Sequence, residues 1–334
     1  MNRYPANNNM VGTHLVEGIL TKFPEISSLG AARLLYAAHP AVWPNQQACR
    51  YAVQRARGKA GKKNRAAHTR PFFKTPDPNP FGLPDQSDMP YPLYMLEGTK
   101  VLLLSDVHVP YQDNEALTVA IKTGVEFGAD AVFLNGDIMD FYQLSRFNKD
   151  PRERSFVQEL KDGRALFNSI RYALPDAKIY WKLGNHEERY QIYLWNKAPE
   201  LLGLPGMSLP EFMKLEELDV KIIPDKLRVK VGKLTVLHGH EIFGKGTGGV
   251  NPARGAYLNY SDNVVIGHFH RTSQHSETTV TDRVISCWST GCLCQLHPYY
   301  ARLNKWNLGF ALIEVVEGGA FSVHNKRIYE GKVW

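Results

Sequence analysis

The sequence predicts a layered α/β fold, an αββα sandwich of two β-sheets covered by helices, preceded by a small, mainly helical N-terminal domain. Three observations carry this prediction. Apolar runs typical of buried strands alternate with helix-spaced segments over residues 101–183, strands dominate from residue 220 onward, and a proline-rich stretch separates both from a helical beginning. We expect the first half of the sandwich to be mostly parallel and the second half to be more antiparallel.

The N-terminal part is expected to hold two short helices. Ser27 or Ser28 can cap the first, SSLGAARLLYAA, in which apolar residues recur at helical spacing. Two prolines then enforce a turn, and Asn45 can cap the second, the basic QQACRYAVQRARG. Two short helices joined by a tight turn resemble a helix-turn-helix, although many helical hairpins share this pattern. Residues 1–70 are therefore predicted to form a basic, helix-turn-helix-like module, for which DNA binding and a purely structural role both stay open.

The positive charge of the chain is concentrated in this first part. Lys and Arg number 12 against 6 Asp and Glu in residues 1–99, whereas the remaining residues hold 28 against 27. Nine basic residues and no acidic one lie between Arg50 and Lys74. Such a run is most often a solvated, flexible arm, but it also suits contact with a phosphate backbone. The partner expected for this segment is nucleic acid, with DNA as the first choice.

A linker is expected after the module. Residues 71–92 read PFFKTPDPNPFGLPDQSDMPYP and contain seven of the 20 prolines. Neither a helix nor a central strand tolerates that density. We therefore expect an extended, semi-rigid linker over residues 71–98 and a folded domain over residues 99–334.

The remaining composition excludes several classes of protein. No apolar run approaches the roughly 20 residues of a membrane span, and the polar start lacks the apolar core of a signal peptide. The 4 cysteines make no disulfide framework in a chain of 334 residues. Cys292 and Cys294 form a GCLC pair without the second pair that a zinc knuckle needs, so buried, reduced cysteines are expected. These features predict a cytoplasmic protein with no membrane partner, and they leave its oligomeric state open.

Residues that can bind metal ions follow five of the apolar strands. Polar side chains just past the carboxyl ends of strands are where open α/β sheets place their ligands. Each short motif is common by itself, but the five occur in order and each follows an apolar run. The candidates are Asp106 and His108 after residues 101–105, Asp137 after 131–135, Asn185 and His186 after 179–183, His238 after 234–237, and His268 and His270 after 264–267.

These motifs, DVH, GD, GNHE, HGH and GHFH in that order, resemble the pattern of the calcineurin-like metallophosphoesterase superfamily. The resemblance covers roughly residues 100–325 and does not extend to residues 1–95. It implies the αββα sandwich already expected from the strand pattern. It also implies a site that holds two divalent metal ions and hydrolyses phosphoesters.

The resemblance assigns a role to each candidate ligand. Asp137 is similar to the carboxylate that bridges the two ions, which lie roughly 3.5–4 Å apart in such sites. A water molecule shared by the ions becomes hydroxide near neutral pH and can attack phosphorus in line. Oxygen and nitrogen ligands without thiolate suit Mn²⁺ as the first choice, with Fe, Zn²⁺ or Ni²⁺ as alternatives. The first metal would take Asp106, His108 and His270, and the second would take Asn185, His238 and His268.

Two further residues match catalytic positions of the superfamily. His186 corresponds to the histidine that acts on the leaving group, and Asp140 to the carboxylate that often orients it. For Asp140, a helix cap or a surface position is an equal alternative. His240 is left outside the ligand set, and its role stays open.

The sequence after the bridging aspartate departs from that of protein serine/threonine phosphatases. It reads GDIMDFYQ, so Phe141 stands where those enzymes carry a phosphate-binding arginine. Arg146, Arg189 and Arg254 could supply a phosphate contact from neighbouring loops, although an ordinary surface position is the default for each.

The leading hypothesis is therefore a dinuclear-metal phosphodiesterase or nuclease that acts on nucleic acid held by the N-terminal module. The alternative is a phosphoesterase of small molecules or nucleotides, with the module used for assembly. A third hypothesis, a binding or scaffold protein with an inactive site, is disfavoured because no ligand position is replaced. The polarity of cleavage cannot be deduced from the sequence.

Overall fold

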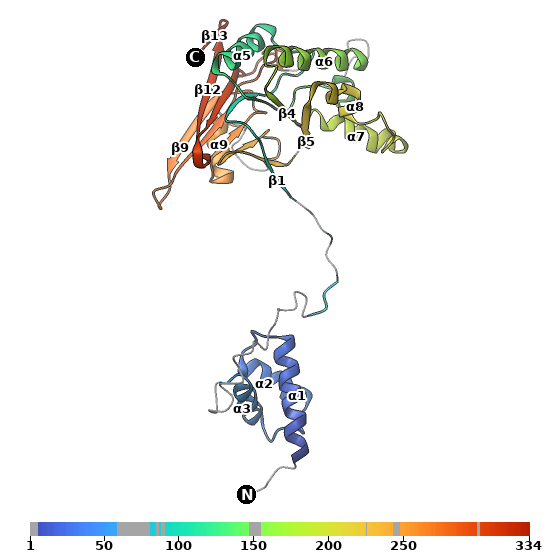
Figure 1. Ribbon diagram of the computed structural model, residues 1–334, viewed down its shortest axis with the longest axis vertical. Coiled ribbons are helices and arrows are strands. Elements are labelled where there is room, and N and C mark those ends of the chain that lie inside the picture. Colours follow the sequence, from blue (N-terminus) through green and yellow to red (C-terminus); the bar gives the residue numbers. More distant parts are fainter. Residues whose placement is uncertain are drawn as a thin grey trace. The chain divides into compact units, whose positions relative to one another are not determined.

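The structure, a computed structural model, describes residues 6–58, 81–84, 87, 91–146, 155–224, 226–242, 248–298 and 301–334. It contains two compact units, Met1–Met89 and Pro90–Trp334 (Figure 1). Most of the basic run from Arg50 to Lys74 and much of the expected linker lie outside the described residues.

The N-terminal unit holds three helices, α1 (Ala6–Lys22), α2 (Ser28–Ala38) and α3 (Gln46–Ala56). The two expected helices and their caps are confirmed: Ser27 Oγ accepts a hydrogen bond from the Gly30 amide at 2.9 Å, and Asn45 Oδ1 accepts one from the Ala48 amide at 2.8 Å. Helix α1 was not expected, because its polar start carries no cap signal.

Helix α1 is stabilised by packing against its two neighbours. Its Val16 and Leu20 are buried in one cluster with Ala31, Trp43 and Val53. Tertiary packing of an apolar face contributes most of the stability of a helix, so a weak local signal is no obstacle to its formation.

The larger unit is built on two sheets, of which the first has seven strands in the order β13-β12-β11-β2-β3-β4-β5. Strands β2 to β5 run parallel, whereas β11, β12 and β13 are antiparallel to their neighbours. The bounds are Lys100–Leu104 (β2), Ala131–Asn135 (β3), Lys178–Lys182 (β4), Val220–Ile223 (β5), Leu308–Val315 (β11), Phe321–Tyr329 (β12) and Lys332–Val333 (β13).

The second sheet has six strands in the order β1-β6-β7-β8-β10-β9. Strand β8 is parallel to β7 and β10, and β1 is parallel to β6, while the β6–β7 and β9–β10 pairs are antiparallel. The bounds are Leu93–Met95 (β1), Arg228–Val231 (β6), Leu234–Leu237 (β7), Val264–Ile266 (β8), Ser273–Thr278 (β9) and Val284–Ser289 (β10).

Strand β1 corrects the linker expected over residues 71–98. Leu93 pairs with Arg228 and Met95 with Lys230, so residues 93–95 belong to the folded unit. The three-residue strand forms an edge of its sheet, where the flanking prolines are tolerated because no second neighbour requires their missing amide protons.

Helices cover the outer face of each sheet. They span Asn114–Phe127 (α5), Phe156–Ala173 (α6), Glu188–Lys197 (α7), Leu209–Met213 (α8) and Pro252–Tyr260 (α9), with 3₁₀ turns at Tyr142–Leu144, Pro199–Leu201, Leu215–Leu218 and Glu317–Gly319. Helices α5, α6, α7 and α8 share a core with the seven-stranded sheet, and α9 packs on the six-stranded sheet (Figure 1). In the described ranges, we find no helix with both the length and the apolar character that a membrane crossing requires.

The two faces of β2 show how the layers are held together. Val101 and Leu103 lie in the core between the sheets, and Leu102 and Leu104 lie in the core under the helices. A strand buried on both faces reads as a continuous apolar run rather than an alternating one. The αββα sandwich is therefore confirmed. All four cysteines are buried and free, and among them Cys292 and Cys294 were expected to be buried.

Candidate metal centre

The seven predicted ligands meet where the carboxyl ends of strands from both sheets come together. The seven-stranded sheet supplies those that follow β2, β3 and β4, and the six-stranded sheet supplies those that follow β7 and β8. Asp106, His108, Asp137 and Asn185 come from the first sheet, and His238, His268 and His270 come from the second.

The backbone turns sharply as it leaves these strands. Asp106, His108, Asp137, His268 and His270 all adopt left-handed φ angles, of 56°, 50°, 52°, 65° and 55°. Few residues other than glycine adopt this conformation, and it is found where the surrounding structure holds a functional side chain in place.

Two glycines of the motifs allow the turns to approach one another. A Cβ on Gly267 would lie 2.7 Å from Asp106 Oδ2, and a Cβ on Gly136 would lie 2.6 Å from the His238 ring. Any side chain at either position would displace a predicted ligand.

Asp137 lies at the middle of the cluster. Its Oδ2 is 3.3 Å from His238 Nε2 and 3.9 Å from the Nε2 atoms of both His108 and His186. Only 2% of the residue is exposed. One buried carboxylate oxygen therefore faces imidazoles from both sheets, as a ligand shared by two cations must.

Asp106, His108 and His270 form the first group. Asp106 Oδ1 lies 3.2 Å from His270 Nε2, and the Nε2 atoms of His108 and His270 face each other at 3.3 Å. His108 Nδ1 lies 3.1 Å from Asp140 Oδ1 and donates its proton there, which leaves Nε2 as the free lone pair.

His238 and His268 lie on the other side of Asp137, and Asn185 directly precedes His186, whose amide donates to Asp137 Oδ1 at 2.9 Å. Ligand atoms of Asp137, His238 and His268 lie within 4.8 Å of one another. His238 Nδ1 donates to the Asn135 carbonyl at 2.7 Å, so its Nε2 is the free ring nitrogen.

Three buried atoms of this second group are unsatisfied. Asn185 Oδ1, His238 Nε2 and His268 Nδ1 have no hydrogen-bond partner among the described residues. A buried polar atom without a partner costs about 1–3 kcal/mol, and a bound cation would remove that cost. The residues present therefore fit a metal ion.

Burial and mutual charge shift the pKa values of these groups. Burial raises the pKa of Asp106, but His270 and His238 together outweigh it and lower the pKa to about 2. Burial lowers the pKa of His238, but the carboxylates of Asp137 and Asp106 outweigh it and raise the pKa to about 10. Without a cation, His238 thus holds a proton at neutral pH. A metal ion must displace that proton, so its affinity for the site should rise with pH.

His186 and Asp140 are also in contact. His186 Nδ1 lies 3.1 Å from Asp140 Oδ1 and 3.0 Å from the Asp140 carbonyl oxygen. Burial lowers the pKa of His186, but Asp137 and Asp140 together raise it above its ordinary value. Asp140 also accepts from His108, and the following 3₁₀ turn is preceded by Phe141 and has no side-chain cap. The structure therefore places Asp140 in the site and not at a helix cap.

Of the three candidate arginines, Arg189 contacts His186 and Asp140. Its Nη1 donates to the Asp140 carbonyl at 2.7 Å, and its Nη2 lies 2.9 Å from His186 Nε2. Arg146 and Arg254 are exposed. The sequence could not distinguish the three, because Arg189 reaches Asp140 across 49 residues.

Glu187 is the last residue of the GNHE motif, and the sequence predicted no role for it. Its buried carboxylate accepts four backbone N–H groups that join the loops after β3 and β4. Burial raises its pKa above the ordinary value. The donors are Gly184 at 2.7 Å and Asp137 at 3.0 Å to Oε2, and Ile138 at 2.8 Å and Met139 at 2.9 Å to Oε1.

Glu187→Gln should lower the stability of the protein. The amide NH₂ group accepts no hydrogen bond, so two buried backbone donors lose their acceptor. We expect a loss of about 3 kcal/mol in the free energy of unfolding, measured in urea. Glu200→Gln, at an exposed position, is the matched control and should change stability by less than about 0.5 kcal/mol. Equal stabilities of the two variants would contradict a structural role for Glu187.

A buried ion pair holds the turn that carries His238. Lys182 Nζ donates to Glu241, both side chains being almost fully buried, and Glu241 Oε2 accepts from the Gly239 amide at 2.7 Å. Lys182 and the other groups around Glu241 outweigh burial and hold the pKa of its carboxyl at about 2. His240 lies on this turn, and burial lowers its pKa to about 4. It is therefore a neutral ring beside His238, and its role stays open.

Cys294 is a neighbour of the site that the sequence did not identify. Its Sγ and ring nitrogens of His108 and His270 lie within 4.8 Å of one another. Contact with Cys292, together with burial, raises the pKa of the Cys294 thiol well above its ordinary value. A protonated thiol is a poor metal ligand, so the oxygen and nitrogen donors dominate.

The chain is similar to proteins of two mycobacterial phages. The "Gene 54 protein" of Mycobacterium phage L5 is 27% identical over 267 residues, covering 70% of this chain and 98% of that protein. The protein of the same name from Mycobacterium phage D29 is 25% identical over 264 residues, with the same coverage of 70% and 98%. Among solved structures, Vacuolar Protein Sorting 29 from Cryptosporidium parvum aligns with a TM-score of 0.38 and 14% identity, covering 71% of this chain and 94% of that one.

The family of calcineurin-like phosphoesterases matches residues 99–312, about two thirds of the chain. That range contains all the strand-end motifs and every residue of the cluster around Asp137. The resemblance noted in the sequence is thereby confirmed, and the chain belongs to the calcineurin-like phosphoesterases, which are metal-dependent phosphoester hydrolases.

Proposed function

We propose that the protein is a dinuclear phosphodiesterase that cleaves nucleic acid, with DNA as its first candidate substrate. The observation that carries this proposal is the uneven distribution of positive charge along the chain. Residues 1–99 carry twice as many basic as acidic residues, 12 against 6, whereas the phosphoesterase part is nearly neutral. A polyanionic substrate is attracted by such a field, and a small ester has no need of it.

The two groups around Asp137 would hold two divalent cations. Asp106, His108 and His270 would bind the first and Asn185, His238 and His268 the second, with Asp137 shared between them. When bound, such cations lower the pKa of a coordinated water molecule and neutralise charge on the phosphate. Mn²⁺ is the first candidate, because the donors are carboxylate, amide and imidazole.

His186 would supply the proton that the leaving oxygen needs. Its Nδ1 is held by Asp140 at 3.1 Å, which fixes the ring and favours the protonated form. Its Nε2 meets the Arg189 guanidinium at 2.9 Å. An incoming phosphate would attract that guanidinium, because Arg pairs with phosphate through two parallel hydrogen bonds. Nε2 would then be free to carry the proton to the leaving group.

Deleting residues 1–89 tests the nucleic-acid assignment. The cut follows the boundary of the larger unit and spares β1. We expect hydrolysis of bis-p-nitrophenyl phosphate with Mn²⁺ to be unchanged, while the KM for labelled single- or double-stranded DNA rises. In a plot of the logarithm of the DNA-binding constant against the logarithm of the salt concentration, the line should also become less steep. Its slope should change by about 0.9 for each duplex phosphate that the module neutralises.

The control is sedimentation of both proteins. A change of oligomeric state with no change in salt dependence would assign the N-terminal unit to assembly. If the truncated enzyme bound and cut DNA as tightly as the full chain, the substrate would instead be a small phosphoester.

A further inference from the structure

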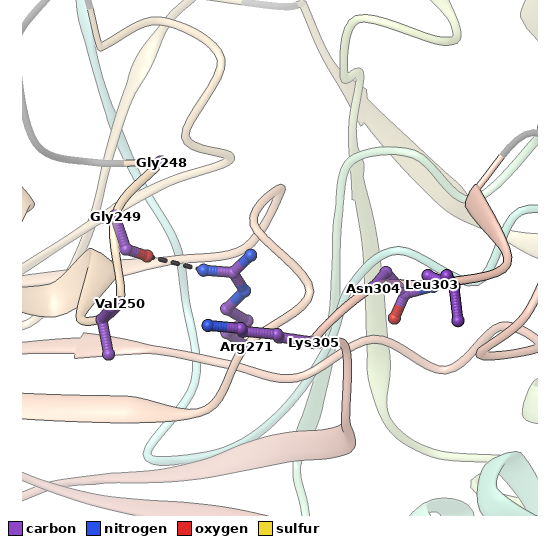
Figure 2. Close-up of a pocket in the computed structure, with 7 residues that line it drawn as sticks. All are labelled: Gly248, Gly249, Val250, Arg271, Leu303, Asn304 and Lys305. Atoms are coloured by element: carbon purple, nitrogen blue, oxygen red, sulfur yellow. Dashed lines mark hydrogen bonds between the residues drawn. The ribbon is translucent and has the colours of Figure 1, made fainter.

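A cavity of about 550 Å³ opens on the larger unit (Figure 2). Its walls are formed by residues 248–250, Arg271 and residues 303–305, which are not among the predicted metal ligands. The walls come from the segment before α9, the loop after β8 and the loop before β11.

Two of the segments that line the cavity adjoin His270. Arg271 directly follows His270, so their Cα atoms are about 3.8 Å apart. Lys305 directly precedes Trp306, whose ring packs edge-on against the His270 ring at 4.2 Å between centroids. Asn307 N donates to the His270 carbonyl at 2.9 Å. Arg271 and Lys305 therefore lie on chain segments next to the place where His270 would hold a metal ion.

Two cationic side chains line the cavity, and no carboxylate is found among its described lining residues. Arg271 Nη1 donates to the Gly249 carbonyl at 2.7 Å, as Figure 2 shows, and its buried Nε has no hydrogen-bond partner among the described residues. One hydrogen bond thus holds the guanidinium in position, while its Nε–H has no acceptor among the described residues. Lys305 is exposed and free to turn toward an anion.

Two aliphatic side chains also line the cavity. Val250 is 85% exposed and Leu303 is fully exposed, although both line the same cavity. Apolar surface next to positive charge suits a ligand that joins an anionic group to a less polar one. A nucleotide has this character, because its phosphate is attached to a sugar and a base.

We propose that this cavity binds the phosphate adjacent to the scissile one in a nucleic-acid strand. Arg271 and Lys305 hold the phosphate, and Val250 and Leu303 contact the attached nucleoside. This inference rests on the proposed function and adds to it a second phosphate subsite. The cavity would make the enzyme prefer substrates that carry two phosphates over those that carry one.

The test measures binding by calorimetry on the full chain loaded with Mn²⁺, so that it does not depend on turnover. The probes are thymidine 3′,5′-bisphosphate and the two thymidine monophosphates. We expect the wild-type protein to bind the bisphosphate about tenfold more tightly than either monophosphate. Lys305→Met should reduce this ratio toward one, and Arg271→Gln should do the same, while the better monophosphate binds as before.

Lys122→Met is the matched control, because Lys122 is an exposed lysine on α5. It should keep the wild-type ratio, which separates local contact from a general effect of net charge. An unchanged ratio in Lys305→Met, or equal binding of bisphosphate and monophosphates to the wild type, would overturn the subsite. Hydrolysis of bis-p-nitrophenyl phosphate is measured in parallel. Its absence would reject the proposed phosphodiesterase, whereas its presence without a bisphosphate preference would reject the subsite alone.

Discussion

Asp137→Asn should abolish phosphoester hydrolysis and reduce metal content together. The carboxylate oxygen that faces His108, His186 and His238 would lose its negative charge, and both proposed cation positions share that oxygen. Because bound cations contribute several kcal/mol to the stabilisation of the transition state, the rate should fall by about 10³-fold or more.

Elemental analysis and turnover of bis-p-nitrophenyl phosphate should be measured on the same preparation. The control is Asp176→Asn, which removes an exposed carboxylate outside the motifs and should leave both values unchanged. An Asp137→Asn variant that retained two metal ions and the wild-type turnover would show that Asp137 is not the shared ligand.

His186→Gln should slow the chemistry by about 10²–10⁴-fold and leave the metal content unchanged, because general acid catalysis typically contributes that much. The loss should be smaller for p-nitrophenyl esters, whose leaving group needs no proton, than for alkyl esters. The neighbouring carboxylates raise the pKa of His186, so the acid form persists above its ordinary range. Wild-type activity should fall as pH rises through this pKa, and the variant should lack that decline.

His324→Gln, on strand β12 and exposed, controls for the loss of a histidine elsewhere. It should behave as the wild type on both kinds of ester. Equal impairment of His186→Gln on p-nitrophenyl and alkyl esters would argue against an acid role and for a role of His186 in positioning Arg189 or Asp137.

The two proposals about the substrate concern different parts of the chain. The N-terminal unit would raise the affinity for a long polyanion through charge, with a marked dependence on salt. The cavity at Arg271 and Lys305 would act on one phosphate next to the scissile bond. If the two contributions are independent, deletion of residues 1–89 and substitution of Lys305 should have effects on the free energy of DNA binding that add.

Local patterns were sufficient to predict most of the framework. Apolar runs such as VLLLS and AVFLN predicted β2 and β3, because strands buried on both faces must be continuously apolar. Ser27 and Asn45 predicted the starts of α2 and α3, because a cap is a contact over three residues. The candidate ligands could be identified for a similar reason: each directly follows a strand, and the carboxyl ends of strands from both sheets meet at one place.

Contacts between distant segments were beyond the reach of such patterns. Strand β1 forms because Leu93 pairs with Arg228, and helix α1 because Val16 and Leu20 pack on other helices. Glu187 acquires its role by accepting amides about 50 residues away, at Asp137 and Ile138.

The cavity, too, is formed by segments that are distant in the sequence. Arg271 and Lys305 lie more than 30 positions apart in the sequence, and each looks like an ordinary surface cation there. Both line one cavity in the folded chain, where their sequence neighbours His270 and Trp306 are in contact. Residue type and spacing predict which side chains follow a strand, whereas the partner that satisfies a buried charge or amide depends on which strands and loops the folded chain brings together.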